Sequence, residues 1–350
     1  MNTVTLDKIA SVTKNIGLSN DVTLSDKIIP EAGHVVVGRI HGVKTAYNQL
    51  ENCDGRFVQI HRGDIVAGVL GHRNALRGYS GKVPELIAVG DTLQVLNLGG
   101  VVGKHTSGNP KVGKPFDFEV LGSVLLEKAD GDKEHAHIQK HSVSPLSDEE
   151  PSTPIPIIYV AGTCMQAGKT SAATSIIRGL RDKNIKVGAC KLTGVSLLRD
   201  TLEMLDYGAT HALSFMDDGI VTTSSVNAAD SARRVIHTLM RKDVEVIVAE
   251  LGDGILGSYG VKEILADAQL LNYATTFILC ANDPVGAWGG VEILKHTYQV
   301  TPDVICGPTT DNLAGVKYIE EELGIKAINA RVSSKALTES VCIDLNKCKE

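Results

Sequence analysis

One stretch of the chain, residues 157–178, constrains the fold more than any other, and its sequence is IIYVAGTCMQAGKTSAATSIIR. It begins with a short apolar run, which predicts a buried strand, and it ends in an Ala- and Ile-rich segment, which predicts a helix. The loop between them closes with Gly168-Lys169-Thr170. A strand, a glycine-bounded loop ending in GKT and a following helix are together typical of a phosphate-binding P-loop.

The residue types of this loop suit phosphate binding. Glycines let backbone N–H groups turn towards an anion, and the helix N-terminus adds partial positive charge. Lys169 is predicted to reach the β- and γ-phosphates and act in catalysis, and the Thr170 hydroxyl to bind Mg²⁺. The nucleotide-binding residues predicted in this segment are Gly162, Thr163, Gln166, Ala167, Gly168, Lys169, Thr170 and Ser171.

The loop departs from the usual spacing at its start. Five residues separate Gly162 from Gly168, one more than usual, and Thr163 stands where the first glycine is expected. The alternative interpretation is a chance GKT at an ordinary helix start. The strand and the helix predicted on either side favour the nucleotide site.

The composition limits the class of protein and its partners. The 350 residues are enough for two domains with a sizeable core. The net charge of -6 and the lack of a long basic run argue against nucleic-acid binding. No apolar run approaches membrane-spanning length and no signal-peptide pattern opens the chain, so we expect no membrane partner.

The seven cysteines are scattered without C-x-x-C pairs. Several lie in predicted core strands, which favours free buried thiols and a cytoplasmic location. Cys164 is the exception, because it lies inside the predicted phosphate loop and is therefore a candidate for oxidation.

The N-terminal part, residues 1–126, predicts a small all-β domain. From His34 onwards, short β-branched runs are separated by Gly, Asp, Asn and Pro, which is typical of a barrel or sandwich. Its loops carry many groups suited to anions, although a solvated rim is the alternative interpretation. These groups lie in His61-Arg62-Gly63-Asp64, His72-Arg73-Asn74, Arg77 and Lys104-His105.

Residues 127–155 are charged, rich in Ser and Pro and poor in apolar side chains, so they predict a flexible linker. His135, His137 and His141 lie in this segment. We expect them to be solvated rather than metal-bound, because no cysteine partner or rigid scaffold accompanies them.

Strands and helices alternate in residues 156–350, which predicts a P-loop α/β domain with a mostly parallel sheet and helices on both faces. The predicted strands are Ile157–Ala161, Lys186–Cys190, Val244–Leu251, Thr275–Ala281, Asp303–Cys306 and Ala327–Asn329. Further predicted helices are Ala228–Arg241, Lys262–Gln269, Gly289–Tyr298 and Asn312–Leu323.

Polar residues follow several of these strands, and in such sheets the ligand lies at the carboxyl ends of the strands. Lys191 ends the second strand, and Glu250, which ends the third, precedes Gly252-Asp253-Gly254. A carboxylate there suits Mg²⁺, and the amide of Asn312 after the fifth strand suits a purine edge. Capping and turn chemistry could explain each residue alone, but their common edge favours a binding site.

The loop GTCMQAGKT followed by VGACKLTG resembles the phosphate loop and second strand of the dethiobiotin synthetase group of P-loop proteins. The turn after Glu250 and the segment Gly307–Asn312 resemble that group's acidic strand end and adenine-side loop. The resemblance covers about residues 156–330 and also extends to cobyrinate-type amidases and two-domain proteins of the DUF1611 kind. Partitioning-type ATPases are less similar, because their loop has an additional lysine where this chain reads Thr163-Cys164-Met165.

The resemblance implies an enzyme that uses ATP and Mg²⁺ to phosphorylate a carboxylate or carbamate, which an amine then attacks. Lys169 and Lys191 would flank the transferred phosphoryl, while Thr170 and Glu250 would hold Mg²⁺. Asp200, within the acidic segment 196–225, is a candidate for a further metal contact, with a solvated helix face as the alternative. That segment or the barrel would present a small carboxylate- or amine-bearing metabolite.

A nucleotide-switched ATPase whose barrel binds a protein partner is the second hypothesis. No guanine-reading N/T-K-x-D motif is present, since Ala281-Asn282-Asp283-Pro284 lacks the lysine, so ATP is preferred to GTP. A homodimer through the C-terminal domain is expected, because most soluble oligomers have two-fold symmetry.

Overall fold

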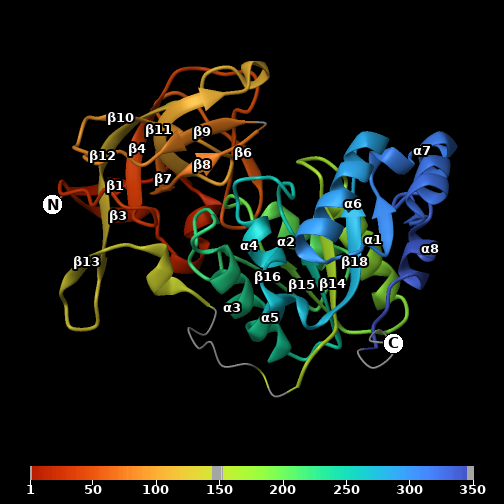
Figure 1. Ribbon diagram of the computed structural model, residues 1–350. Helices are drawn as coiled ribbons and strands as arrows, with labels where there is room; N and C mark the ends of the chain where they lie inside the picture. The colour runs from red at the N-terminus through yellow and green to blue at the C-terminus, as the bar shows by residue number, and fades with distance from the viewer. Residues whose placement is uncertain (1, 77, 144–150, 152, 345–350) are drawn as a thin grey trace. The chain divides into compact units, whose positions relative to one another are not determined.

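The computed structural model describes residues 2–76, 78–143, 151 and 153–344 (Figure 1). The chain divides into two compact units. The first contains residues 1–143 with the short segments 195–199 and 216–222, and the second contains residues 144–194, 200–215 and 223–350. The predicted α/β class with a separate N-terminal β domain is confirmed.

A closed β-barrel forms the centre of the first unit. Strand β12 (Asp117–Glu127) pairs with β4 (Val35–His41), and β4 pairs with β7 (Ile65–Leu70). Strand β7 runs parallel to β11 (Val101–Gly108), and β10 (Thr92–Val95) pairs with both β11 and β12. This last pair of contacts closes the ring of strands.

β-Branched side chains fill the barrel because strands alternate their residues between the two faces. Val35, Val37, Val69 and Val120 are fully buried. The remaining strands of this unit are β1 (Asn2–Thr5), β2 (Lys8–Ile9), β3 (Asp21–Ser25), β5 (Gln49–Glu51), β6 (Phe57–Gln59), β8 (Arg73–Asn74), β9 (Tyr79–Lys82) and β13 (Lys133–His135). Its short helical turns are η1 (Ser11–Ile16), η2 (Pro110–Val112) and η3 (Ile138–His141).

The predicted flexible linker begins with ordered structure. Strand β13 pairs with β12, and Ile138 at the start of η3 is buried, so residues 133–141 belong to the first unit. His135 bonds the Ser123 hydroxyl at 2.7 Å, and His137 packs edge-on against the buried His34. These two histidines are half-buried and make structural contacts, so they remain partly solvated, while residues 144–150 and 152 of the predicted linker lie outside the described residues.

A seven-stranded sheet forms the centre of the second unit, and every pair in it is parallel. The strand order is β16-β15-β17-β14-β18-β19-β20. These strands are β14 (Ile157–Gly162), β15 (Val187–Lys191), β16 (His211–Ser214), β17 (Val246–Glu250), β18 (Ala274–Cys280), β19 (Val304–Cys306) and β20 (Lys326–Ala327).

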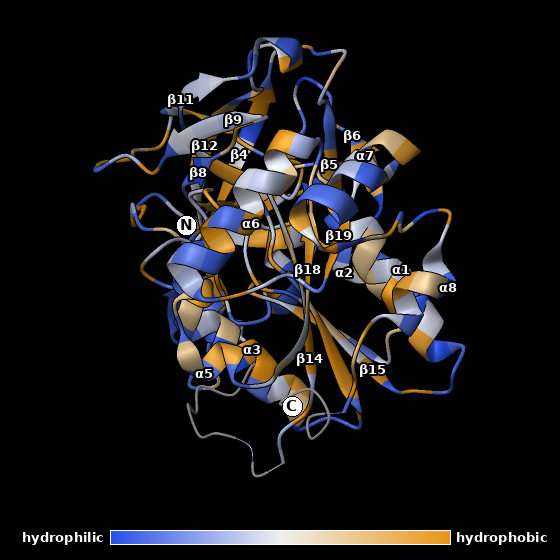
Figure 2. Ribbon diagram, turned by 45° about the vertical axis from the view of Figure 1, so that its right-hand side comes forward, coloured by the Kyte–Doolittle hydropathy of each residue, from blue (hydrophilic) through white to orange (hydrophobic). Residues whose placement is uncertain are grey.

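Helices cover both faces of this sheet, which explains why its strands are nearly all apolar (Figure 2). On β14, Ile158 and Val160 pack into one core cluster and Ile157 and Tyr159 into the other. The first face carries α1 (Lys169–Arg181), α2 (Arg199–Asp206) and α8 (Ser334–Glu339). The second carries α3 (Ala228–Met240), α4 (Val261–Leu265), α5 (Ala268–Leu271), α6 (Pro284–Tyr298), α7 (Leu313–Tyr318) and the π-helical turn η5 (Ile319–Leu323).

Two sequence expectations need correction here. Helix α2 and edge strand β16 fall in the segment 196–225, for which a helix was only the alternative interpretation at Asp200 and no strand was predicted. Cys342 is disulfide-bonded, whereas Cys53, Cys164, Cys190, Cys280 and Cys306 are free thiols. Among the described residues, every helix is too short or too polar to cross a bilayer.

Candidate functional site

The predicted P-loop joins β14 to α1 at the carboxyl edge of the parallel sheet. Gly168 has a positive φ of 94° and is the N-cap of α1, so a residue without a Cβ is favoured there. A Cβ at Gly162 would lie within 3.2 Å of three atoms of the Lys169 side chain. Both glycines therefore fit a tightly turned loop around the lysine.

Lys169 is buried at the first position of α1. Its ammonium donates a hydrogen bond to the carbonyl of Cys164 at 2.9 Å and another to the carbonyl of Asp253. The first contact lies within the loop, and the second ties the loop to the turn that follows β17. Phosphate oxygens are stronger acceptors for an ammonium group than neutral carbonyls, so an arriving phosphate can replace them.

Thr170 and Glu250 come together as the sequence predicts for a metal site. The Thr170 hydroxyl donates to Glu250 Oε1 at 3.2 Å, and Glu250 is buried at the end of β17. Its other oxygen, Oε2, is buried without a hydrogen-bond partner among the described residues. A hydroxyl and an unsatisfied carboxylate oxygen are ligands that suit Mg²⁺ beside phosphates.

Lys191 ends β15 directly beside Glu250, since the two residues are register partners in the sheet. The Lys191 ammonium forms an ion pair with Asp200 on α2, and both side chains are largely buried. Asp200, predicted as a metal ligand, therefore contacts the second predicted catalytic residue instead. The described residues hold no group of three or more His, Cys, Asp or Glu side chains arranged for a metal ion.

Asp253 is the functional candidate that the sequence interpretation did not single out. It lies in the turn after β17 with a positive φ of 72° and is only 9% exposed. In the described part of the chain, neither carboxylate oxygen has a hydrogen-bond partner, and burial raises the pKa of Asp253 above its ordinary value. Three groups oppose that rise in pKa: the charge of Lys169, the backbone amide of Gly254 and the charge of Lys191. The Gly254 amide is not aligned well enough to form a hydrogen bond with the carboxylate.

On the side of the sheet where a nucleotide base is expected, Asn312 has another role. Its side-chain oxygen accepts from Ala314 N at 3.1 Å and so caps α7. A small pocket beside the P-loop is lined instead by Gln166, Gly168, Ser171, Gly307, Pro308, Asp311, Asn329, Ala330 and Arg331. Asp311 and Asn329, which contact each other at 2.9 Å, belong to this lining, and Asn312 does not.

The strand end after β18 is also occupied by structural contacts. Asn282 donates to the sulfur of Cys164 at 3.0 Å, which holds the P-loop from the side of β18. Asp283 accepts from Gly286 N at 2.8 Å and caps α6. These two residues are thus engaged in positioning the loop and the helix.

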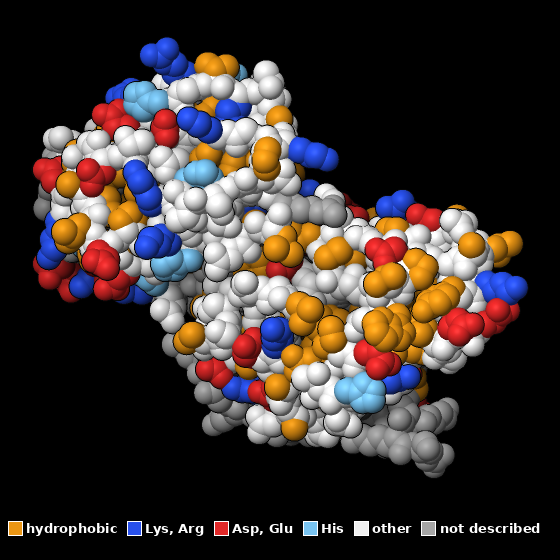
Figure 3. All heavy atoms as spheres, turned by 45° about the horizontal axis from the view of Figure 1, so that its top comes forward, with side chains coloured by type: hydrophobic (Ala, Val, Ile, Leu, Met, Phe, Trp, Pro, Cys, Tyr) orange, Lys and Arg blue, Asp and Glu red, His pale blue; other side chains and the backbone are white. Residues whose placement is uncertain are grey.

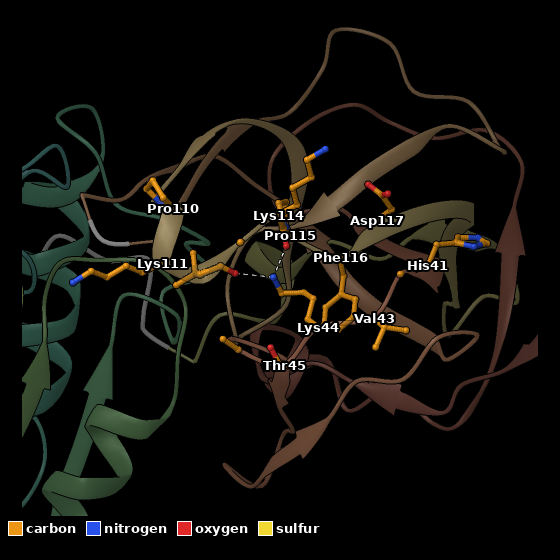
Figure 4. Close-up of a pocket in the computed structure, with 14 residues that line it drawn as sticks. His41, Val43, Lys44, Thr45, Pro110, Lys111, Lys114, Pro115, Phe116 and Asp117 are labelled. Carbon is orange, nitrogen blue, oxygen red and sulfur yellow. Dashed lines mark hydrogen bonds between the residues drawn. The ribbon is translucent and has the colours of Figure 1, made fainter.

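The barrel loops contain a separate cavity of about 570 Å³ (Figure 4). Lys44 extends across it and donates hydrogen bonds to the Tyr79 hydroxyl and the carbonyl groups of Val112 and Lys114. Burial lowers the pKa of Lys44. All three N–H groups of this ammonium have acceptors, so its role is to hold the loop of residues 110–115.

The predicted anion contacts of the barrel loops do not gather at this cavity. The Arg73 guanidinium is buried and donates to the Tyr47 hydroxyl and the Leu96 carbonyl. Arg77 lies outside the described residues. None of the predicted loop residues lines the cavity, whose polar side chains are His41, Lys44, Thr45, Lys111, Lys114 and Asp117.

No protein-family model matches the chain, and no curated protein is significantly similar to it in sequence. Solved structures with a partly similar fold include the signal recognition particle receptor FtsY from Elizabethkingia anophelis, with a TM-score of 0.37 and 9% identity over 54% of this chain and 66% of the receptor. A DUF1611 family protein from Anabaena variabilis has a TM-score of 0.38 and 13% identity, over 55% of this chain and 62% of that protein.

A nucleotide-binding protein from Archaeoglobus fulgidus, solved in complex with ADP, has a TM-score of 0.38 and 11% identity. The match covers 53% of this chain and 87% of that protein. The alignments with FtsY and with the DUF1611 protein each span less than two thirds of those chains. Because the TM-scores and identities are low, we infer neither activity nor substrate from these structures.

Proposed function

We propose that the protein is an ATP- and Mg²⁺-dependent enzyme of the dethiobiotin synthetase-like group. It phosphorylates a carboxylate or carbamate of a small metabolite and so prepares it for ligation to an amine. The observation that carries this proposal is the convergence of three charged residues beside the P-loop: Lys169 on α1, Lys191 on β15 and Glu250 on β17. Two cations and a buried carboxylate with an unsatisfied oxygen suit phosphoryl transfer better than passive anion binding.

The proposed chemistry assigns a task to each residue. A carboxylate oxygen is a poor leaving group and a phosphorylated one is a good leaving group, so the protein mainly positions the reactants and neutralises charge. Lys169 would bind the transferred phosphoryl, and Lys191 would bind the phosphoryl or the acceptor carboxylate. Thr170 and Glu250 would hold Mg²⁺, which supplies charge neutralisation between phosphate oxygens.

ATP is proposed over GTP because the residues after β18 are not arranged to read guanine. The Asn282 amide is hydrogen-bonded to Cys164, and Asp283 caps α6. The residue after Asn282 is Asp283, where the guanine-reading motif has a lysine. The proposed location is the cytoplasm; the free buried thiols at Cys190, Cys280 and Cys306 support it, and the disulfide-bonded Cys342 does not.

A screen of carboxylate and amine metabolites for stimulated ADP release tests the proposed reaction. With Mg²⁺ and ATP, we expect one pair of metabolites to raise ADP release at least tenfold, an order-of-magnitude figure for positioned acceptors. The same mixtures without Mg²⁺ are the control. Slow hydrolysis that no metabolite changes, together with ATP-dependent binding of a protein partner, would favour the nucleotide-switched ATPase instead.

A homodimer through the second unit is part of the proposal. Val285 and Trp288 on α6 and Leu313 on α7 are exposed, and Figure 3 shows hydrophobic side chains gathered on this unit. Large exposed apolar patches mark interaction sites.

Light scattering tests this dimer, and we expect it to give twice the mass of one chain. Trp288→Glu should give a monomer, while Leu205→Glu, on the other face of the sheet, should leave the dimer intact. A monomeric wild-type protein would contradict this part of the proposal.

A further inference from the structure

The carboxylate of Asp253 is buried and has no hydrogen-bond partner among the described residues, and its turn lies beside the two predicted catalytic lysines. Lys169 bonds the backbone carbonyl of Asp253, and the charges of Lys169 and Lys191 both act on its carboxylate. A Cβ at Gly252 would lie 3.1 Å from Lys191 Cε, which places this turn against that lysine as well. The turn that carries Asp253 therefore packs against both lysines that the proposed function assigns to the phosphoryl group and its acceptor.

Such a carboxylate would ordinarily form an ion pair with a neighbouring lysine, because an unpaired buried charge is costly. Here the Lys169 ammonium donates to two backbone carbonyls, and Lys191 pairs with Asp200. Asp253 thus keeps both oxygens available as acceptors. Two nearby ammonium groups also disfavour a divalent cation at this position, and Thr170 and Glu250 already offer a metal site.

We infer that Asp253 is a catalytic residue that accepts the proton of the attacking nucleophile. This inference rests on the proposed function and narrows it, since the nucleophile must carry an exchangeable hydrogen, as an amine does. The flanking Gly252 and Gly254 allow the turn to adjust when the Lys169 contact passes from the Asp253 carbonyl to a phosphate.

The step balances without any further reactant. In the ligation, a bond forms between the amine nitrogen and the acyl carbon, and the bond from that carbon to the phosphate oxygen breaks. The electron pair leaves with the phosphate, and the proton of the amine moves to the Asp253 carboxylate. In basal hydrolysis, a water oxygen bonds the γ-phosphorus, and the bond from that phosphorus to the bridging oxygen of ADP breaks. ADP leaves with the electron pair, and the proton of the water moves to the Asp253 carboxylate.

The pH dependence follows from the direction of the pKa change. Burial raises the pKa of Asp253, so its basic form is reached at higher pH than for an ordinary aspartate, and the rate should rise with pH through that range. The titratable groups on the surrounding elements are Cys164, Lys169, Lys191, Asp200 and Glu250. The pH profile of the Asp253→Asn variant is therefore needed, because only the part of the wild-type profile that this variant loses can be assigned to Asp253.

Basal release of ADP from Mg²⁺-ATP, with water as the acceptor, tests the inference in Asp253→Asn. We expect the rate at saturating ATP to fall by about 100-fold or more, with the rising limb of the pH profile lost and ATP affinity by calorimetry unchanged. Asn tolerates a positive φ, so the fold should persist. Asp303→Asn is the matched control, because burial also raises the pKa of Asp303, which lies at the amino end of β19.

Each outcome supports or rejects the role of Asp253. Equal rates in wild type and Asp253→Asn with ATP binding intact, including no hydrolysis in either, would reject it and leave the proposed function standing. Three further results would reject the role. They are a rising limb of the pH profile that persists in Asp253→Asn, a higher Mg²⁺ requirement in that variant, or an equal loss of ADP release in Asp303→Asn. A wild-type protein that does not bind ATP would reject the proposed function together with this inference.

Discussion

Replacing Lys169 by alanine is expected to weaken binding of Mg²⁺-ATP by at least about 100-fold, which corresponds to about 3 kcal/mol for hydrogen bonds to a charged group. Lys169 is the cation that the P-loop encloses, and its ammonium is held by the carbonyl of Cys164 within that loop. Its removal leaves the phosphates without their closest positive charge. Calorimetric titration of the variant with ATP measures this effect directly.

The control for Lys169→Ala is a lysine at the opposite edge of the same sheet. Lys186 precedes β15, is exposed and pairs with Asp243, so Lys186→Ala should leave ATP affinity unchanged. Thermal unfolding of both variants shows whether the fold is retained. Unchanged ATP affinity in a folded Lys169→Ala protein would remove the basis of the proposed nucleotide site.

The P-loop, the parallel sheet and the barrel could be predicted because each depends on local patterns. Apolar runs of strand length and a GKT at a helix start need no knowledge of distant residues. Register then brings Lys191 and Glu250 together, because parallel strands end at one edge. Five of the six predicted strands extend beyond the observed ones at one or both ends, since turn residues adjoin apolar strand residues.

The sequence expectations and the structure differ where distant contacts or competing local roles decide. Residues 133–135 look like a linker in composition, yet pairing with β12 makes them a strand. Asn312 suits a base by its chemistry, but it stands one residue before a helix and caps it. Asp200 is an ordinary helix-face acid in the sequence, and only the fold brings it to Lys191.

Asp253 shows a different limit of sequence reasoning. Its Gly-Asp-Gly context predicts a turn, and a turn aspartate is usually a solvated residue that bonds its own backbone. The structure instead buries the side chain without a partner. Burial depends on how the turn packs against the P-loop, where a Cβ at Gly254 would lie 2.5 Å from the Thr163 carbonyl oxygen.

Lys191→Met is expected to lower turnover by about 100- to 1,000-fold while leaving ATP affinity nearly unchanged, as when one preorganised charge is removed from a transition state. The ion pair with Asp200 offers a competing explanation in which Lys191 only neutralises a buried acid. Breaking a buried pair on one side costs about 3–5 kcal/mol of stability, so the single variant alone does not separate the two roles.

The double variant Lys191→Met with Asp200→Asn separates them. The double variant carries no charge at position 191 or 200, so most of the lost stability should return and the temperature of unfolding should approach that of the wild type. If Lys191 binds the transferred phosphoryl or the acceptor carboxylate, turnover stays low despite the restored stability, because the positive charge is still missing. If ADP release recovers together with stability, Lys191 only neutralises Asp200 and stabilises the fold. The carboxylate-activation mechanism would then have to be abandoned.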